Sequence, residues 1–337
     1  MAITRLTDVI AAAPHVFSAL VAEAATDLSK FRQSGIIQGS PYWDGRAQGE
    51  GFETTVRSWA PLYLGTEATS ADDSDTEIVA RKVQGKNLVA RRFHRALAYA
   101  SADIVKDQLG VDPLEYAASQ FGRLWADDEE AMALAMLKSI EASDPGRSAD
   151  KKFVKSFTRT TGTIDDTNKL TAFNMLASKN VLGDAGESIT GFIVHSDVYT
   201  ALQQREPNAF VPVSQTSVDV YRYLNKFTIT VSDRMGKDTT NAAYPVYTNI
   251  AHGAGFFGAG NGGNTTVVDR SEKKGSGWGQ ETIISRSTKL LHPMGFNCAA
   301  TPANGVSLTN TELADTAAFS LSVERKAVPL VIVKTNG

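Results

Sequence analysis

Residues 253–258 read Gly-Ala-Gly-Phe-Phe-Gly and have the spacing of a dinucleotide-binding glycine motif, the most chemically specific pattern in the chain. That chemistry requires a helix to begin at the glycine turn, so that its N-terminus faces the pyrophosphate. Asp269 lies at a suitable distance beyond the motif, but residues 259–264 read Ala-Gly-Asn-Gly-Gly-Asn, which cannot begin a stable helix. We therefore predict a glycine-rich turn after a strand. A nucleotide-dependent enzyme that uses residues 253–258 stays as an unfavoured alternative.

The histidines and the single cysteine do not form a recognisable catalytic or metal site. No histidine has a histidine partner four residues away or lies at zinc-ligand spacing from Cys298, which we expect to be a buried structural thiol in an apolar strand. Ser196 and Asp197 follow His195, but Ser196 lacks the Gly-x-Ser-x-Gly turn of a nucleophile, and we expect it to cap a helix. The five histidines are His15, His94, His195, His252 and His292. The sequence therefore predicts no catalytic, cofactor-binding or metal-binding residues, and no enzyme.

Length, composition and charge describe a globular chain that is long enough for a full core. The 337 residues have a mass of 36.1 kDa, with 42% apolar and 21% charged residues, which favours two or so modules over a disordered or fibrous protein. The 34 basic and 37 acidic residues give a net charge of -3, so neutralising nucleic-acid phosphates is not the main activity. One cysteine excludes an intrachain disulfide framework. Charged residues and a proline interrupt the most apolar stretch, residues 6–25, so we predict no membrane-spanning segment.

The strongest helical pattern lies at residues 113–142. Pro113 is preset for a first helical position, and Asp112 with Glu115 resembles a capping box. Apolar residues then recur every three or four positions until a strong stop at residues 143–146. At 1.5 Å per residue, this helix would be about 45 Å long and would act as a spine.

On either side of this helix, the pattern alternates between shorter helices and strands, as in a mixed α and β protein. Period-two alternation is clearest at residues 227–231, which predicts a half-buried strand. Residues 282–291 and 294–299 are expected to form a strand pair. The remaining predicted helices cover residues 96–109, 166–178 and 197–204, and the remaining predicted strands cover residues 191–195, 244–250, 319–323 and 328–333.

The first 95 residues predict two extended segments rather than a compact domain. Residues 1–48 mix an Ala-rich, helix-prone stretch with turn-rich sequence, and such segments usually need another surface to become ordered. Residues 49–95 predict a hairpin or a long loop, in which an acidic run at 72–77 precedes a basic run at 81–95. We interpret these residues as a solvated loop, in which the acidic and basic side chains neutralise one another. The alternatives are opposite charges that face a neighbouring copy, and a nucleic-acid patch, which the adjoining carboxylates disfavour.

The order of these segments resembles that of the major capsid proteins of tailed bacteriophages, which have the Hong Kong 97-like fold. An arm, a charged loop, a spine helix, a central α/β module and a strand-rich return follow one another over nearly the whole chain. Each matching stretch is short, and their order carries the resemblance. The stretches are residues 17–37, 96–103 with Asp112 and Pro113, 193–199 with Leu202, 247–258, 292–296 and 324–333.

The resemblance implies an α+β subunit of a viral shell, divided as in that family. The divisions would be an N-terminal arm at residues 1–48, an extended loop at 49–95, a peripheral domain with the spine helix at 96–146, an axial domain at 147–280, and peripheral strands with the C-terminal return at 281–337. Such subunits assemble with themselves into hexamers and pentamers, which form an icosahedral head around double-stranded DNA without sequence-specific binding. The resemblance is compatible with portal, scaffolding and decoration proteins as further partners. It implies assembly in the host cytoplasm and a final place in the virion, with no membrane.

Shells of this fold differ in whether their chains are covalently joined and in what they enclose. Some members of the family join chains by a lysine–asparagine isopeptide bond, and Lys82 or Lys86 could be compared with that lysine, but no motif fixes the match and we predict no cross-link. An encapsulin-like compartment, which encloses a protein cargo in a shell of the same fold, is the alternative within the fold. Head-to-tail contacts that close rings would serve either shell.

Overall fold

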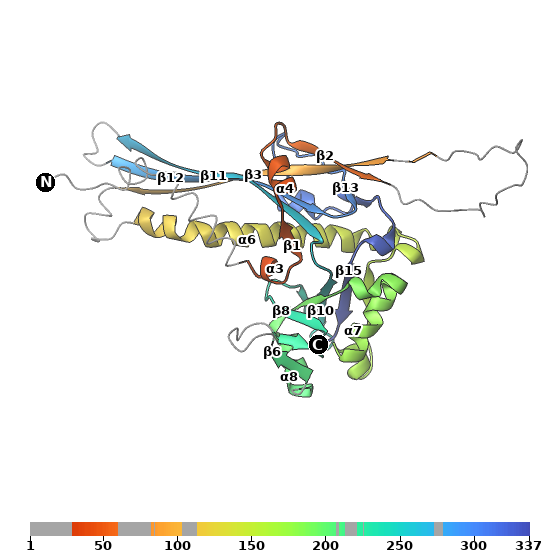
Figure 1. Ribbon diagram of the computed structural model, residues 1–337. Helices are drawn as coiled ribbons and strands as arrows, with labels where there is room; N and C mark the ends of the chain where they lie inside the picture. The colour runs from red at the N-terminus through yellow and green to blue at the C-terminus, as the bar shows by residue number, and fades with distance from the viewer. Residues whose placement is uncertain are drawn as a thin grey trace, which may run out of the picture.

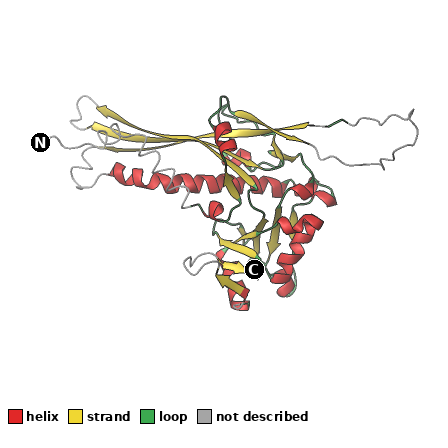
Figure 2. Cartoon of the chain, viewed as in Figure 1, coloured by secondary structure: helices red, strands yellow, loops and turns green. Residues whose placement is uncertain are grey.

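The computed structural model describes residues 29–59, 82–83, 85–102, 113–206, 209–212, 221–224, 226–272 and 279–337. A long sheet lies along one side of a long helix, and a smaller module of strands and helices lies on its other side (Figure 1). We call this second part the small module; the C-terminus lies in it. Figure 2 shows helices and strands in both parts, which confirms the prediction of a mixed α and β chain.

The long helix, α6, spans Pro113–Ala142, as its sequence pattern predicts. Five of the large side chains that it buries recur every four residues, with one gap of seven: Phe121, Trp125, Met132, Met136 and Ile140. The helix ends at the predicted stop, where Asp144–Gly146 forms a short 3-10 turn, η1. The predicted capping residue Asp112 lies outside the described residues.

The long sheet has five strands: β1 (Ile37–Gly39), β2 (Glu53–Trp59), β3 (Gly85–Ala102), β11 (Phe257–Glu272) and β12 (Gly279–Pro293). Their order across the sheet is β1-β11-β12-β3-β2, and every pair is antiparallel except β1 with β11. The pairing of β11 with β12 has one shift of register, between Asn261 and Gly263. Trp125 of α6 donates its indole N–H to Ser285 Oγ of β12 at 3.0 Å, which fixes the helix against the sheet.

The hairpin predicted within residues 49–95 is present where the structure describes it, because β2 pairs with the first half of β3. The second half of β3 contains residues 96–102, so the prediction of a helix at 96–109 is wrong there; its other residues fall in the part of the chain that is not described. Alanine favours a helix in isolation, but here β12 supplies a full ladder of backbone hydrogen bonds. Leu97 is more buried than the exposed residues on either side of it, which is the alternation of a strand.

The strand pair predicted from residues 282–291 and 294–299 is not formed. The first run belongs to β12, which continues to Pro293 between β11 and β3, whereas Phe296–Cys298 (β13) pairs with Phe319–Leu321 (β14). Gly295 separates the two runs with a φ of 85°, a conformation that favours glycine. Apolar runs indicate buried strands, but they do not identify the partner of each strand.

The small module is built on an eight-stranded sheet. Its strand order is β4-β15-β10-β5-β8-β7-β6, with β9 beside β10. The strands are β4 (Val154–Ser156), β5 (Gly191–Val194), β6 (Phe210–Pro212), β7 (Tyr221–Tyr223), β8 (Phe227–Val231), β9 (Lys237–Asp238), β10 (Val246–His252) and β15 (Leu330–Thr335). The predicted strands at 191–195, 227–231, 244–250 and 328–333 are confirmed, with small shifts at their ends. The helix predicted at 197–204 is α8 (Ser196–Arg205).

The helix predicted at residues 166–178 is divided into two pieces. A 3-10 turn, η3 (Asp166–Asn168), comes first, and α7 (Ala172–Lys179) follows after extended backbone at Lys169. Thr171 caps α7, since its side chain accepts a hydrogen bond from Asn174 N at 3.3 Å. A capping residue inside an apparently continuous helical pattern ends one helix and begins another, which explains the error.

The cap of α8 also differs from the prediction. Ser196 is the first residue of the helix, and His195 is the capping residue. The Nδ1 atom of His195 accepts a hydrogen bond from Asp197 N at 3.1 Å. Histidine is an unusual cap, so composition alone favoured the neighbouring serine.

The two sheets cross the predicted divisions of the chain. Residues 257–272 and 279–280 fall in the predicted axial division but belong to the long sheet, and Leu330–Thr335 lies between β4 and β10 of the small module. One cluster of buried side chains joins the long sheet, α6 and the small module, as Phe93, Met136 and Ile250 illustrate. The other short elements are η2 (Ala149–Lys151), η4 (Asn180–Ser188), α9 (Asn310–Leu313) and η6 (Arg325–Ala327). Among the helices of the described ranges, none has the length and apolar character needed to span a membrane.

Candidate functional site

Residues 29–48, which we call the arm root, pack on the body of their own chain. They form α3 (Lys30–Gln33), β1 and α4 (Pro41–Ala47). Phe31 is fully buried, and Trp43 is only 7% exposed. Residues 1–48 are expected to need another surface to become ordered, and the arm root finds it on its own chain; residues 1–28 are not described.

Glycines of β11 make room for the arm root. A Cβ atom on Gly258 would overlap the Trp43 indole, and one on Gly260 would overlap the Trp43 carbonyl group. A Cβ on Gly262 would lie 2.8 Å from the Ala47 carbonyl oxygen. Successive residues of a strand point to opposite faces, so glycines two apart clear one face. Helix α4 therefore lies directly on the backbone of β11.

The glycines of the motif at residues 253–258 have structural roles: a Cβ on Gly253 would lie 2.5 Å from the Ser188 carbonyl oxygen, Gly255 has a φ of 70°, and Gly258 makes room for Trp43. The chain turns after β10 and enters β11 at Phe257, so a strand and not a helix follows the motif. The prediction of a glycine-rich turn after a strand is confirmed at residues 253–256, whereas the glycines at 258–263 belong to β11. The helix N-terminus that would face a pyrophosphate is not formed at this turn.

Four consecutive acidic residues of α6, Asp127, Asp128, Glu129 and Glu130, contact the arm root, the long sheet and the small module; we call them the acidic quartet. Glu129 accepts hydrogen bonds from Arg32 Nε at 2.7 Å and Arg32 Nη2 at 3.0 Å. Glu130 accepts from the first two backbone N–H groups of α3, at 2.6 and 3.2 Å. A carboxylate placed there satisfies donors that a helix start leaves unpaired. These two acids therefore fix the arm root to α6.

The other two acids of the quartet reach different segments. Asp127 Oδ1 lies 2.8 Å from Arg234 Nη2 in the small module, and Asp128 Oδ1 lies 3.9 Å from Arg95 Nε of β3. Burial raises the pKa of Asp128 and of Glu130 above their ordinary values, while nearby arginines, and for Glu130 also the backbone N–H groups, oppose the rise. About one turn of α6 thus connects the three parts of the fold.

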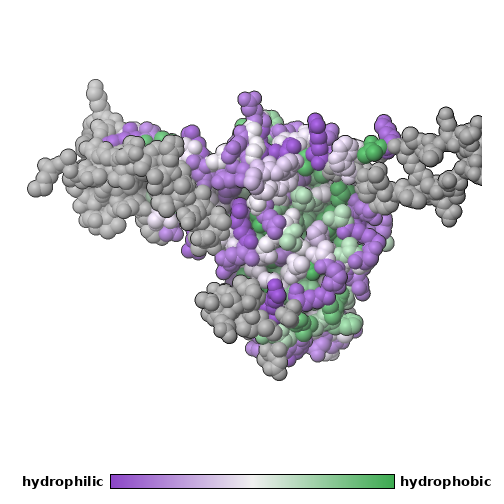
Figure 3. Space-filling model, viewed as in Figure 1, coloured by the Kyte–Doolittle hydropathy of each residue, from purple (hydrophilic) through white to green (hydrophobic). Residues whose placement is uncertain are grey.

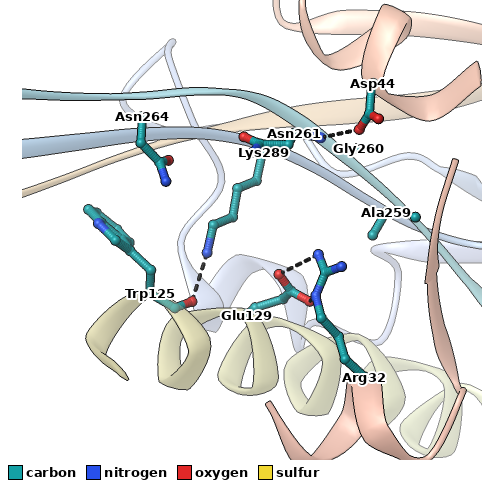
Figure 4. Close-up of a pocket in the computed structure, with 10 residues that line it drawn as sticks. Arg32, Asp44, Trp125, Glu129, Ala259, Gly260, Asn261, Asn264 and Lys289 are labelled. Atoms are coloured by element: carbon teal, nitrogen blue, oxygen red, sulfur yellow. Dashed lines mark hydrogen bonds and ion pairs between the residues drawn. The ribbon is translucent and has the colours of Figure 1, made fainter. Parts of the chain in front are cut away.

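A cavity of about 240 Å³ lies where the arm root, α6 and strands β11 and β12 meet (Figure 4). Lys289 extends from β12 into it and donates a hydrogen bond to the Trp125 carbonyl oxygen at 2.7 Å. Burial lowers the pKa of this lysine. On the opposite wall, Asp44 accepts from Asn261 N at 2.8 Å. The charged groups of the cavity bind neighbouring protein groups and include no nucleophile beside a base, so the geometry suits a structural junction.

The histidines and the cysteine take structural positions. His252 and His292 are each 1% exposed, and burial lowers the pKa of each to about 4. His94 is exposed on β3, and His15 is not described. Cys298 is buried, as predicted, and burial raises the pKa of its thiol. Within the described ranges, no three His, Cys, Asp or Glu residues are grouped so that they could hold a metal ion.

The basic run at residues 81–95 is not a uniformly solvated loop. Arg91 and Arg92 are only 8% and 4% exposed, and Arg91 pairs with Glu53 across the hairpin of β2 and β3. The solvated-loop interpretation is therefore wrong for these two arginines. The acidic run at 72–77 lies outside the described residues, so its partners stay a matter of prediction.

The arrangement of the two sheets around α6 is that of phage capsid subunits. A chain from the capsid asymmetric unit of cyanophage Pam1 is 15% identical and gives a TM-score of 0.54, with 92% of this chain and 93% of that chain covered. A chain from the capsid of Ralstonia phage GP4 is 7% identical and gives a TM-score of 0.58, with 92% of each chain covered. At these identities the likeness establishes a shared fold.

Sequence comparison gives the family. A family model described as "Phage capsid protein" matches residues 90–290, more than half of the chain, and the chain belongs to this family. The chain is also similar to the major capsid protein of Bacillus phage SPP1, with 27% identity over 335 residues that cover 99% of this chain and 98% of that protein. The chain is a structural, non-enzymatic subunit of a phage shell and hence a component of the virion, as the order of its segments predicts. These matches support neither an encapsulin-like compartment nor a nucleotide-dependent enzyme.

Sequence reasoning did not find the junction of the arm root with α6 and β11. Two signals for it were present: glycines spaced two apart, which is the period of a strand, and four acids in a row within an amphipathic helix. The glycines cannot begin a stable helix and therefore indicate a turn, but the sequence does not show that those from Gly258 onward continue as a strand. The acids have no partners nearby in the sequence, so only the fold identifies what they bind.

Proposed function

We propose that this chain is the major capsid protein of a tailed phage, with the Hong Kong 97-like fold, and that copies of it form hexamers, pentamers and then an icosahedral head. The observation that carries the proposal is an exposed aromatic residue on the hairpin of β2 and β3, in the edge strand of the long sheet (Figure 1). Trp59 at the end of β2 is 76% exposed, and nearby Val83 is 53% exposed. Large exposed apolar groups of this kind serve contacts between proteins, and a neighbouring copy would cover them in a shell.

The surroundings of Trp59 suit such a contact. Its ring lies against Gly85 of the paired strand, where an added Cβ atom would be only 3.5 Å from a ring atom. An aromatic side chain has few rotatable bonds, so it loses little conformational entropy when a partner covers it. Lys82 and Lys86, close to Val83 and Gly85 in the sequence, are also exposed and bring positive charge to this part of the hairpin, where Lys86 Nζ donates to the Ser322 carbonyl oxygen at 2.6 Å. The neighbouring copy is expected to offer a pocket with acidic residues at its rim.

The divisions inferred from the resemblance describe how a copy would contribute to the shell. Residues 1–48 and 49–95 are the arm and the extended loop, and residues 96–146 and 281–337 are the peripheral domain. The resemblance assigns residues 147–280 to the axial domain around the five-fold and six-fold axes; because β11 and the start of β12 belong to the long sheet, we assign only the small module to that position. Because the arm root packs on its own copy, we assign only residues 1–28 of the arm to a neighbouring copy.

The head would enclose double-stranded DNA without reading its sequence. A net charge of -3 supports this view, since a strongly basic wall would retain the packaged polymer. Portal, scaffolding and decoration proteins are the further partners, and the host cytoplasm is the place of assembly. A strongly basic inner surface in assembled particles would contradict this part of the proposal.

Assembly of purified chains tests the proposal, with Trp59→Ser as the decisive variant. The exposed ring contributes little to the stability of a single copy, so the variant subunit should unfold at nearly the wild-type urea concentration. It should nevertheless give a much lower yield of closed shells in sedimentation and negative-stain electron microscopy. Val306→Ser, at a residue that is 55% exposed outside the hairpin, is the matched control and should assemble normally. Normal shell yield from Trp59→Ser would refute the role of the hairpin.

A further inference from the structure

The chain contains asparagine–glycine pairs, at which an asparagine side chain reacts most readily with its own backbone. Glycine has no Cβ atom to obstruct the approach of its backbone nitrogen to the preceding side chain. Asparagine is for this reason one of the residues that limit the lifetime of proteins. All of these pairs lie within the described residues, so their surroundings can be compared. The pairs are Asn261 with Gly262, Asn304 with Gly305, and Asn336 with Gly337.

The side chain of Asn304 is held in a geometry that favours this reaction. Its Oδ1 atom accepts hydrogen bonds from Val306 N at 2.9 Å and from Ser307 N at 3.0 Å. An asparagine oxygen bound to the backbone that follows it is typical of a turn. When a nucleophile attacks Cγ, negative charge develops on Oδ1. The two N–H donors then stabilise this charge, as the donors of an oxyanion hole do.

Gly305 has the space that the reaction requires. Its nitrogen reaches Cγ of Asn304 only after the backbone between the two residues rotates. Both residues are exposed, and a Cβ atom added to Gly305 would meet nothing within 4 Å. The Gly305 N–H donates to the Pro302 carbonyl oxygen at 3.0 Å, and this contact within the turn must break during the rotation. The rotation therefore disturbs a surface turn and leaves the core in place.

The pair at Asn261 is held more tightly. Its side-chain oxygen also has a donor, Gly263 N at 3.0 Å, so the difference lies in the freedom of the backbone. Asn261 N donates to Asp44 at 2.8 Å. A Cβ on Gly262 would lie only 2.8 Å from the Ala47 carbonyl oxygen. Rotation at this pair would break the packing of α4 on β11.

The pair at Asn336 is protected by burial and by hydrogen bonds. Asn336 is 6% exposed, and its backbone N–H donates to the Asn168 carbonyl oxygen at 2.8 Å. Its Nδ2 atom, the group that has to leave, donates to the carbonyl oxygens of Arg159 at 3.3 Å and Pro245 at 3.0 Å. The reaction at this pair would require these contacts to break first.

We propose that Asn304 is a site of spontaneous deamidation in the folded subunit, whereas Asn261 and Asn336 are protected. The Gly305 nitrogen forms a bond with Cγ of Asn304, the bond between Cγ and Nδ2 breaks, and ammonia leaves with the proton of the Gly305 N–H. A water molecule then opens the five-membered imide at either of its carbonyl groups and gives aspartate or isoaspartate. The net reaction exchanges an amide for a carboxylate and adds a negative charge.

Isoaspartate at this position would disturb the attachment of the turn to the long sheet. It adds an atom to the backbone, and the turn continues directly into Ser307 and Leu308, which are buried. Ser307 Oγ accepts a hydrogen bond from His94 N of β3 at 3.2 Å. Figure 3 shows polar side chains, in purple, at the described surface of the long sheet, so water reaches this side of the fold.

Mass spectrometry of the wild-type subunit tests the proposal. The folded protein is kept at mildly alkaline pH and digested, and the mass gain of deamidation is followed at each asparagine. We expect Asn304 to react about tenfold faster than Asn261 or Asn336, or more, which requires a difference of only about 1.4 kcal/mol in activation free energy. An unreacted Asn304, or equal rates in the folded subunit, would overturn the proposal. In urea-unfolded protein the three rates should become similar, and a persistent difference there would show that the fold does not protect the other two.

The variant Asn304→Asp separates the effect of the added charge from that of the added backbone atom. It carries the charge on a normal backbone and keeps an oxygen that accepts from Val306 N and Ser307 N. We expect this variant to unfold at nearly the wild-type urea concentration, and the purified isoaspartate form to unfold at a lower one. An isoaspartate form as stable as the wild type would overturn the predicted effect on the turn.

Discussion

Gly260 marks the point where the Trp43 carbonyl group of the arm root meets β11, and a methyl group has no space there. We predict that Gly260→Ala displaces α4 and lowers the free energy of unfolding by about 2 kcal/mol or more. Gly45→Ala, on α4 where an added Cβ meets open space, is the matched control. It should be neutral or stabilise by roughly 0.5–1 kcal/mol, because alanine favours a helix. Urea unfolding of unassembled subunits gives both values, and a harmless Gly260→Ala would contradict direct packing of α4 on β11.

The two buried histidines predict a pH dependence of stability. His252 and His292 have a pKa of about 4 in the folded chain, below the ordinary value of 6.5, because burial disfavours their charged form. The unfolded chain therefore binds more protons between these values, and stability falls as the pH drops from 6.5 towards 4, by about 3 kcal/mol for each histidine at full effect. Asp128 and Glu130, whose pKa values are raised by burial, add a slope of opposite sign.

The His292→Gln variant isolates one of these two histidines. The difference in unfolding free energy between wild type and variant should shrink as the pH falls from 7 to 5, since the variant has no proton to gain at this position. Nuclear magnetic resonance can follow the same protonation directly. A His292 signal that titrates near its ordinary pKa in the folded chain would contradict the argument.

Single residues also show where sequence reasoning works and where it fails. The apolar neighbours of Cys298 in the sequence indicate a core strand, and the structure confirms that this residue is buried. Composition favours Ser196 as the cap of α8, but this prediction is wrong because the fold uses His195. The packing role of Gly258 and Gly260 could not be predicted, because the helix that lies on them is more than 200 residues away in the sequence.

Among the elements, the signals for α6 are local and strong. Pro113, a regular apolar spacing and a stop at 143–146 determine its bounds without reference to the rest of the fold. Residues 96–102 have the composition of a helix but become a strand, because β12 offers them a continuous ladder. The helix predicted at residues 166–178 is interrupted, because Thr171 caps a new helix, α7, within that range. Local patterns predict elements well until long-range pairing or a cap within the pattern overrides them.

The acidic quartet gives a prediction for the attachment of the arm root. Glu130→Ala leaves two backbone N–H groups of α3 without their acceptor, so we expect the free energy of unfolding to fall by about 1–3 kcal/mol. Hydrogen exchange of residues 30 and 31 should become faster. Glu130→Gln keeps an acceptor oxygen and should lose less, and Lys138→Gln, at an exposed position of the same helix, should change neither quantity. Unchanged exchange in Glu130→Ala would mean that the carboxylate does not hold the arm root.

At the scale of the whole molecule, two truncations separate folding from assembly. Removing residues 1–48 takes buried Phe31 and Trp43 from the core, and should lower the free energy of unfolding by roughly 5 kcal/mol or so. Removing residues 1–28 spares both side chains. The shorter deletion should leave the subunit stable but reduce the yield of shells, because it takes away the part of the arm assigned to a neighbour. If the chain without residues 1–28 forms shells in wild-type yield, the assignment of these residues to a neighbouring copy is wrong.

The central claim is that identical copies of this chain close into a shell through contacts between different surfaces of adjacent copies. A cryo-electron microscopy reconstruction of the particles tests it most directly. The account predicts rings of five and six copies, in which a neighbouring copy covers Trp59 while the arm root stays on its own subunit. Particles in which Trp59 remains open to solvent, or a preparation that contains only stable single subunits, would contradict it.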